Sequence, residues 1–147
     1  MIDLLPVSLG TYNSHLTQVI EDLRDHEVRI FTTTDIEILV QQSKCWYIMA
    51  GEKILGVCGY IEIWKGVLEV FVLPCKSIKQ HPVSFHKKCL ETLAYWMTAT
   101  RAHRLQTTSL ANQDTDKWMT MLGFECEGTL KQYSATKQDY KQWARYK

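Results

Sequence analysis

The sequence lacks three features that would place it in a particular class of protein: a surplus of charge of one sign, a pairing pattern among its cysteines and a long apolar run. Its 17 lysine and arginine side chains oppose 16 aspartate and glutamate side chains, which leaves a formal net charge of +1. A chain so close to neutrality has no general attraction to nucleic acid or to acidic membranes. We therefore predict neither partner and expect any anion site to come from a local cluster of basic residues.

The five cysteines are odd in number, none belongs to a C-x-x-C pair, and most lie inside apolar runs. Such cysteines are typical of free, buried thiols in a reducing compartment. The N-terminal segment lacks the basic residues and long apolar core of a secretory signal, and no run is long enough to span a bilayer. We expect a cytoplasmic protein without a membrane segment. The cysteines are Cys45, Cys58, Cys75, Cys89 and Cys126.

Several catalytic signatures are missing as well. The sequence contains no Walker-type loop and no Ser/His/Asp order. His86 and Cys89 lie one helical turn apart, but no second pair of ligands accompanies them, so we predict no metal site. The five tryptophans are interpreted as core or rim packing.

What is present is the pattern of one α/β domain over residues 1–147, with 46% hydrophobic and 22% charged residues. The apolar period changes between helical and β type along the chain. The expected elements are a strand over 2–7, helices over 11–24 and from 34 to 44, an irregular or extended segment over 25–32, a three-stranded meander over 45–50, 54–64 and 67–73, a helix over 82–102, a strand over 105–110, a helix over 112–123, and strands from 124 and over 139–146. No repeat, linker or low-complexity tract interrupts this order.

The stretch 104–133 carries the most specific pattern. A strand-like run ends at an asparagine, Asn112, which a short helix follows. Asp114 and Asp116 lie in the first turn of that helix, where the positive end of the helix dipole favours acids. Gly123 stands where a helix C-cap needs left-handed backbone, and Phe124 begins the next strand. Four apolar residues are expected on one broad face of the helix: Trp118, Met119, Met121 and Leu122.

This stretch resembles the C-terminal half of the GCN5-related N-acetyltransferases, the GNAT family. The matching pieces are Asn112, Leu122-Gly123-Phe124 and Glu127-Gly128-Thr129-Leu130. The order of elements also follows the family. The resemblance implies a three-layer GNAT-like domain, with helices on both faces of a mixed, twisted sheet of about six to seven strands. It also implies acetyl-CoA as the cofactor and an amine as the acceptor.

In the family, a turn of pattern R/Q-x-x-G-x-G/A binds the cofactor diphosphate. Ser77, Gln80 and Pro82 occupy its three defining positions here, and none of them matches. Residues 75–90 nevertheless hold four lysines and two histidines with no acid (Lys76, Lys79, His81, His86, Lys87, Lys88). Two interpretations stay open: an anion site in which side-chain charge replaces backbone cradling, or a solvated basic loop and helix face.

The resemblance assigns further candidate residues to the cofactor. Its phosphates would contact the segment from Lys76 to Ser84, its thioester would contact strand backbone, and Asn112 would lie near the pantetheine arm. The phosphate candidates are Lys76, Ser77, Lys79, Gln80, His81 and Ser84, and the strand candidates are Val70, Phe71, Val72 and Leu73.

Acid–base chemistry has fewer candidates. Glu69 and Glu62 are the candidate bases for deprotonating the acceptor amine; the alternative is that both simply face solvent on a half-exposed sheet. Met119 stands where the family has a tyrosine acid and cannot donate a proton. Tyr133, Tyr140 or Cys126 would have to replace it.

Two functions of different class follow. The first is an acyl-CoA-dependent N-acyltransferase acting on a small-molecule or protein amine. The second is a catalytically inactive GNAT-fold protein with a binding or structural role. A further resemblance, to GNAT-like proteins of tailed bacteriophages, favours the second and implies a protein partner or virion assembly, in the host cytoplasm or the virion. It lies in Gly56-Val57-Cys58-Gly59, the glycine-free turn, Leu122-Gly123-Phe124 and Asp139-Tyr140.

Overall fold

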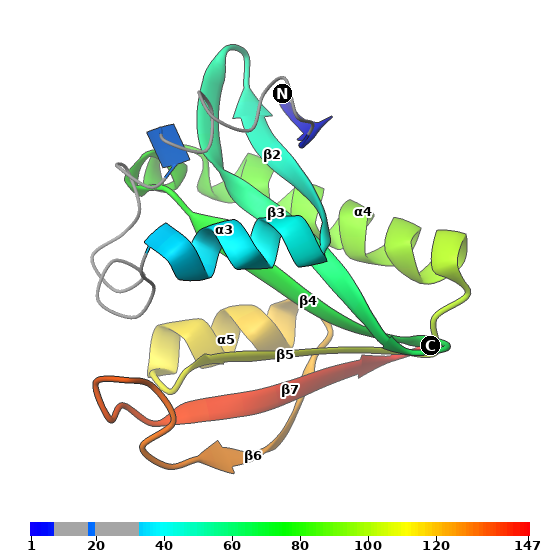
Figure 1. The fold of residues 1–147 in the computed structure, drawn as a ribbon, viewed down its shortest axis with the longest axis vertical. Coiled ribbons are helices and arrows are strands. Elements are labelled where there is room, and N and C mark those ends of the chain that lie inside the picture. Colours follow the sequence, from blue (N-terminus) through cyan, green and yellow to red (C-terminus); the bar gives the residue numbers. More distant parts are fainter. Residues whose placement is uncertain (8–17, 20–32) are drawn as a thin grey trace. The chain divides into compact units, whose positions relative to one another are not determined.

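The described strands form one seven-stranded sheet in the order β1-β2-β3-β4-β5-β7-β6 (Figure 1). The computed structural model describes residues 1–7, 18–19 and 33–147, without the side chains of 33–37. The sheet is mixed, because β4 and β5 are parallel whereas β5 and β7 are antiparallel. This confirms the predicted α/β class and strand number. Apart from Gln18 and Val19, the expected helix over 11–24 and the irregular segment over 25–32 lie outside the described residues.

The chain forms two compact units, residues 1–61 with 71–88 and residues 62–70 with 89–147. The first unit contains β1 and β2, most of β3, the end of β4, and the first turns of α4. Strand β1 pairs antiparallel with β2, and β2 pairs antiparallel with β3. The elements that lie wholly or partly in this unit are β1 (Ile2–Pro6), α3 (Thr33–Gln42), β2 (Lys44–Ala50), β3 (Lys53–Trp64), β4 (Val67–Pro74), the 3-10 helix η1 (Lys76–Gln80) and α4 (Pro82–Thr100).

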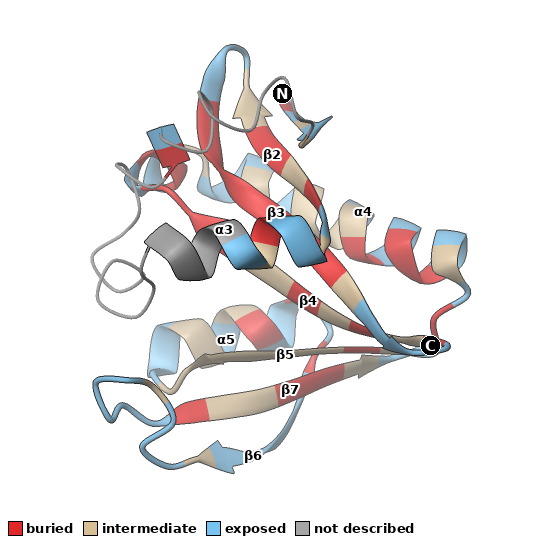
Figure 2. Cartoon of the chain, viewed as in Figure 1, coloured by how far each residue is buried: buried red, intermediate tan, exposed pale blue. Residues whose placement is uncertain are grey.

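Strand β3 is buried without interruption from residue 54 to residue 60 (Figure 2). A strand covered on both faces reads as a continuous apolar run rather than an alternating one, which is the pattern of its sequence. Gly56 allows a close approach, because a Cβ there would lie 2.5 Å from the Leu73 carbonyl oxygen. A Cβ at Gly59 would collide with the Lys44 carbonyl oxygen. The two glycines therefore let β3 fit tightly between its neighbours.

The second unit contains β5 (Arg104–Leu110), α5 (Gln113–Met121), β6 (Glu125–Leu130) and β7 (Tyr140–Tyr146). Strand β7 lies between β5 and β6 and pairs antiparallel with both. Strand β5 pairs with β4 over three residues of each strand, Val67 to Glu69 against Arg104 to Gln106. That short parallel register determines which side chains of β4 and β5 share a face.

Helix α5 has the caps that its sequence predicts. The Asn112 side chain accepts a hydrogen bond from the Thr115 backbone N–H at 2.8 Å. At the other end Gly123 has φ +88°, and the Phe124 N–H donates to the Met119 carbonyl at 3.1 Å, as in a Schellman motif. Strand β6 begins one residue after Phe124.

The predicted apolar face of α5 is wrong at one position. Met119 and Leu122 are buried, whereas Met121 is 56% exposed. Two residues span about 200° around a helix of 3.6 residues per turn, so Met121 points away from the face that carries Met119.

The burial of the thiols is confirmed for three cysteines only. Cys45, Cys58 and Cys75 are buried, Cys89 is half-buried, and Cys126 is exposed; all five are free. Cys126 lies on β6, whose residues are almost all exposed. No described helix is long and apolar enough to cross a membrane.

Candidate functional site

In the first unit, the basic segment (residues 75–88) leads from β4 into α4. The sequence predicts a bend here, and the structure forms the 3-10 helix η1 instead. Its start is fixed to the sheet, because the Cys75 N–H donates to the Leu55 carbonyl at 2.8 Å. Its end leads directly into α4, where the Phe85 N–H donates to the His81 carbonyl at 2.9 Å. The two helical segments are separated only by His81.

The side chains of η1 divide into an inner and an outer set. Ser77 and Ile78 are buried, and the Ser77 hydroxyl donates a long hydrogen bond of 3.4 Å to the Ile54 carbonyl. Ser77 is thus oriented toward the interior, although the family resemblance assigns it to the phosphates. The outer set faces solvent and consists of Lys76, Lys79 and Gln80, with His81 half-buried and Ser84 exposed beyond them.

These residues fit a diphosphate by charge and by backbone donors. Pro82 has no N–H, but the N–H groups of Val83 and Ser84 in the first turn of α4 have no acceptor within that helix. The helix dipole adds partial positive charge at the same end. No acid lies in the basic segment to oppose an anion. The segment therefore offers two amides and several cationic side chains, in place of the usual glycine-rich cradle.

In the second unit, five side chains form one continuous polar chain across four strands. Gln106 Nε2 donates to Glu69 Oε2 at 2.8 Å, and Arg104 Nε donates to Gln106 Oε1 at 2.9 Å. Arg104 also binds Glu127 through both terminal nitrogens, at 2.5 and 2.9 Å. The Tyr146 hydroxyl donates to the same Glu127 carboxylate. We call Glu69, Gln106, Arg104, Glu127 and Tyr146 the polar chain.

The strand registers explain why these residues meet. Glu69 pairs with Gln106 across the parallel β4–β5 ladder, and Arg104 pairs with Tyr146 across the antiparallel β5–β7 ladder. Paired residues point to the same face of a sheet, and so do residues two apart on one strand. Glu127 lies at the register shift between Cys126 and Gly128 on β6.

The two carboxylates of the polar chain have opposite electrostatic environments. Burial raises the pKa of Glu69 above its ordinary value, although the Gln106 hydrogen bond and the Arg104 charge partly oppose that shift. The hydrogen bonds from Arg104 and Tyr146 lower the pKa of Glu127 to about 2. Glu69 is therefore the carboxylate with raised proton affinity, whereas Glu127 stays ionised and holds Arg104 in place.

Glu62, the other candidate base, is not half-buried as Glu69 is. Glu62 is exposed near the end of β3. Met119, at the position of the family tyrosine, is 4% exposed and lies in the core. Of the possible proton donors, Tyr140 is buried and Cys126 is exposed.

The candidate acid Tyr133 is 56% exposed in the loop between β6 and β7. Its ring lies 5.3 Å from the Tyr140 ring, centroid to centroid. Asp139 fastens this loop: its side chain accepts from the Gln132 N–H, and its carbonyl accepts from the Ala111 N–H at 3.0 Å. The structure thereby brings the Tyr133 loop to the exit of β5, one residue before the Asn112 cap. Asn112 itself uses its side-chain oxygen to cap α5.

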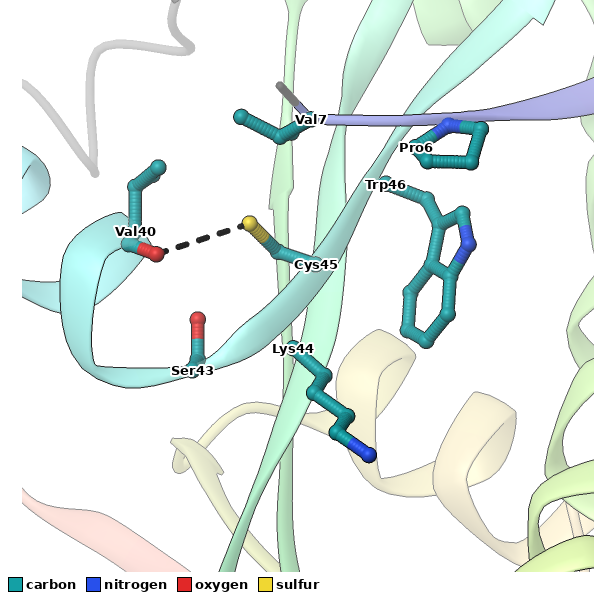
Figure 3. Close-up of a pocket in the computed structure, with 7 residues that line it drawn as sticks. All are labelled: Pro6, Val7, Val40, Ser43, Lys44, Cys45 and Trp46. Atoms are coloured by element: carbon teal, nitrogen blue, oxygen red, sulfur yellow. Dashed lines mark hydrogen bonds between the residues drawn. The ribbon is translucent and has the colours of Figure 1, made fainter. Parts of the chain in front are cut away.

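A separate pocket of about 400 Å³ lies in the first unit, between the end of β1, the end of α3 and the start of β2 (Figure 3). The residues that line it include Ser43, Lys44 and Cys45. The Cys45 thiol points to the Val40 carbonyl, at 3.7 Å. Burial raises the pKa of this thiol, although the nearby Ser43 side chain partly opposes the shift. Cys45 is therefore not an activated nucleophile.

Among the described residues, no group of three or more candidate ligands could hold a metal ion.

Sequence reasoning assigned no role in the site to four members of the polar chain, namely Arg104, Gln106, Glu127 and Tyr146. The available signal is the alternation of Arg104 and Gln106 with apolar Leu105 along a predicted strand. That alternation shows that the two polar residues share a face. It does not show which residue of β4 stands beside them, because this depends on the strand register.

No protein-family model matches the sequence, and no curated protein matches it. Solved structures do match. A variant of the spermidine N-acetyltransferase SpeG from Vibrio cholerae is 16% identical, with a TM-score of 0.76 over 98% of this chain and 94% of that chain. RimL, an α-N-acetyltransferase of a ribosomal protein, in complex with coenzyme A, is 14% identical, with a TM-score of 0.75 over 99% and 93%. A protein described as a probable GNAT acetyltransferase from Chromobacterium violaceum is 15% identical, with a TM-score of 0.74 over 99% and 87%. The chain therefore has the fold of the GNAT acetyltransferases.

Proposed function

We propose that this protein is an acyl-CoA-dependent N-acyltransferase that moves an acetyl group from acetyl-CoA to an amine. The observation that carries the proposal is the basic segment, which places cationic side chains and the N-terminus of α4 directly after β4. The likeness to N-acetyltransferases over almost the whole chain supports it. So does the coenzyme A that the RimL structure contains.

The cofactor would be held mainly by residues of the first unit. Lys76, Lys79 and His81 would neutralise phosphate charge, and the N–H of Ser84 would donate to a phosphate oxygen. Ser77 supports the turn from the inside. The backbone from Val70 to Leu73 would bind the acyl-pantetheine arm. When bound, acetyl-CoA supplies a thioester whose acyl group passes to the amine nitrogen and whose sulfur leaves as a thiolate.

Residues of the second unit would handle the protons. An amine is protonated at neutral pH and must lose a proton before its nitrogen can attack. Glu69 is suited to accept that proton, directly or through a water molecule, because burial raises the pKa of its carboxyl group and so its proton affinity. Tyr133 would donate a proton to the departing thiolate, from the loop fastened beside Asn112.

A second candidate function is binding without turnover, as in a structural or virion protein with this fold. Two observations favour it. The turn before α4 contains no glycine, and Met119 is a buried apolar side chain where the family has its acid.

Thermal unfolding with and without acetyl-CoA tests the cofactor assignment. A ligand at a hundred times its dissociation constant adds about 2.7 kcal/mol to the free energy of unfolding, and the melting temperature should rise accordingly. An unchanged melting temperature at millimolar acetyl-CoA would rule out the transferase. Release of free thiol in the presence of an amine then separates turnover from binding. A rise in the melting temperature with acetyl-CoA, without thiol release, would support the second candidate.

A further inference from the structure

The Gln106 carboxamide lies between a cation and the candidate base, and its orientation is fixed by what each neighbour can do. The Arg104 Nε–H group can only donate a hydrogen bond, so the Gln106 atom facing it must be the carbonyl oxygen Oε1. This leaves the Nε2 group to face Glu69, where it donates to Oε2 at 2.8 Å. The carboxylate of Glu69 therefore meets a hydrogen-bond donor whose direction cannot reverse.

Arg104 is itself held in place from the other side. Its two terminal nitrogens bind both oxygens of Glu127, a geometry that fixes the plane of the guanidinium group. The Tyr146 hydroxyl donates to that carboxylate, and its ring lies 5.6 Å from the Arg104 guanidinium carbon. Glu127 thus fixes the orientation of Arg104. Arg104 fixes that of Gln106, which in turn orients the Glu69 carboxylate.

We infer that Gln106 is a positioning residue, which aims the Glu69 carboxylate so that Glu69 can act as the base toward the acceptor amine. This rests on the proposed function. Gln106 does not need to touch the amine. Its donor occupies Oε2, which leaves Oε1 of Glu69 as the oxygen that accepts the proton of the amine. The charged residues on the neighbouring strands are Arg104 on β5 and, at opposite ends of β3, Lys53 and Glu62, with Glu127 beyond Arg104.

Direct titration of Glu69 tests this inference without any substrate. In ¹³C-labelled protein, the side-chain carboxyl resonance of Glu69, assigned with Glu69→Gln, is followed against pH. In Gln106→Leu the carboxylate loses the donor that stabilises its charged form, so its titration midpoint should move upward. In Gln106→Glu it should move further, because a second carboxylate would stand beside it. If Glu69 titrates as in the unsubstituted protein in both variants, the inference is wrong.

Gln142→Leu is the matched control. Gln142 lies on β7 opposite Thr108, on the same face of the sheet as Gln106, and its side chain donates to the Trp143 carbonyl instead of to the polar chain. This substitution should leave the Glu69 midpoint unchanged. Melting temperatures of all variants show whether each one folds. Gln106→Glu keeps an acceptor for Arg104, and so remains informative if Gln106→Leu fails to fold.

An assay of thiol release from acetyl-CoA tests whether the Gln106–Glu69 hydrogen bond matters for the reaction. The acceptors are spermidine and a short peptide that carries a free α-amino group. In Gln106→Leu, kcat should fall by about 10- to 100-fold, as for a misplaced reacting group, while KM for acetyl-CoA stays constant. The acidic limb of the kcat–pH profile should move in the same direction as the Glu69 midpoint. An unchanged acidic limb would overturn the positioning role and leave the proposed function intact. Absence of thiol release with the unsubstituted protein would instead overturn the proposed function, whatever the titration shows.

Discussion

The basic segment and the polar chain differ in how their charged groups are arranged. In the basic segment Lys76 and Lys79 are exposed, and each carries its charge at the end of a long side chain. Both charges are positive. In the polar chain each group is bonded to the next, and the charges alternate from Glu69 to Arg104 to Glu127. The first arrangement is suited to attracting a polyanion from solution, which requires little geometric precision. The second is suited to holding one carboxylate in one orientation.

From this difference we predict how the two regions should respond to substitution. A site that works by summed charge should lose affinity gradually, one cation at a time, and should be sensitive to salt. A site that works by fixed geometry should lose rate abruptly when one group changes. Four experiments follow in decreasing order of expected effect; three of them test that contrast, and one tests the cap of α5.

The largest effect is expected for Glu69→Gln. The substitution preserves shape and removes the base, so kcat for thiol release should fall by about 10²- to 10⁴-fold, with the affinity for acetyl-CoA unchanged. The matched control is Glu62→Gln, which removes the same charge from an exposed position and should leave kcat near its original value. Equal losses in the two variants would contradict the assignment of the base.

A smaller effect is expected for Lys76→Ala combined with Lys79→Ala. Removal of two cations should raise the dissociation constant of acetyl-CoA by about tenfold or more, measured by calorimetry, while the kcat of saturated protein changes little. Lys117→Ala combined with Lys131→Ala removes two exposed lysines of the second unit and should not weaken binding. Addition of salt should weaken binding more in the unsubstituted protein than in the Lys76/Lys79 variant. An equal salt dependence in the unsubstituted protein and the Lys76/Lys79 variant would contradict the idea that the basic segment binds by summed charge.

The third experiment concerns the cap of α5. In Asn112→Ala the Thr115 N–H loses its acceptor, so the free energy of unfolding should fall by about 1 kcal/mol, measured by urea denaturation. Asn112→Ser retains a capping oxygen and should recover most of that loss. If Asn112→Ser restores stability but not acetyl-CoA affinity, Asn112 also contacts the cofactor. If neither substitution changes stability, the cap contributes nothing.

The smallest effect is expected for Glu127→Gln, because its pair with Arg104 is partly exposed and such pairs contribute less than about 1 kcal/mol. The folded-state pKa of Glu127 is lowered from 4.5 to about 2. Its contribution is therefore fully present above pH 4.5 and is lost as the pH falls toward 2. The difference in melting temperature between the two proteins should shrink over that window. A difference that stays constant down to pH 2 would contradict the assigned cause.

The sequence predicted the described fold closely because its signals are local. The strand boundaries of β2, β3 and β4 lie within one residue of the predicted ones, since apolar runs and the turn residues Gly51 and Gly66 are read directly along the chain. Met121 and Cys126 were misjudged because an apolar residue type does not reveal on which side of a helix or strand it lies. The phage resemblance and the cofactor-binding residues stay predictions.

The sequence by itself determined helix α5 with its caps, since Asn112 and Gly123 act on backbone groups within a few residues of themselves. It also determined the acid-free charge of the basic segment. Only the tertiary structure decided that Glu69 accepts a hydrogen bond from Gln106, because this contact depends on the register that puts Gln106 beside Glu69. The physical reason is that a ladder joins residues far apart in the chain, and a shift of one residue would turn every side chain to the opposite face.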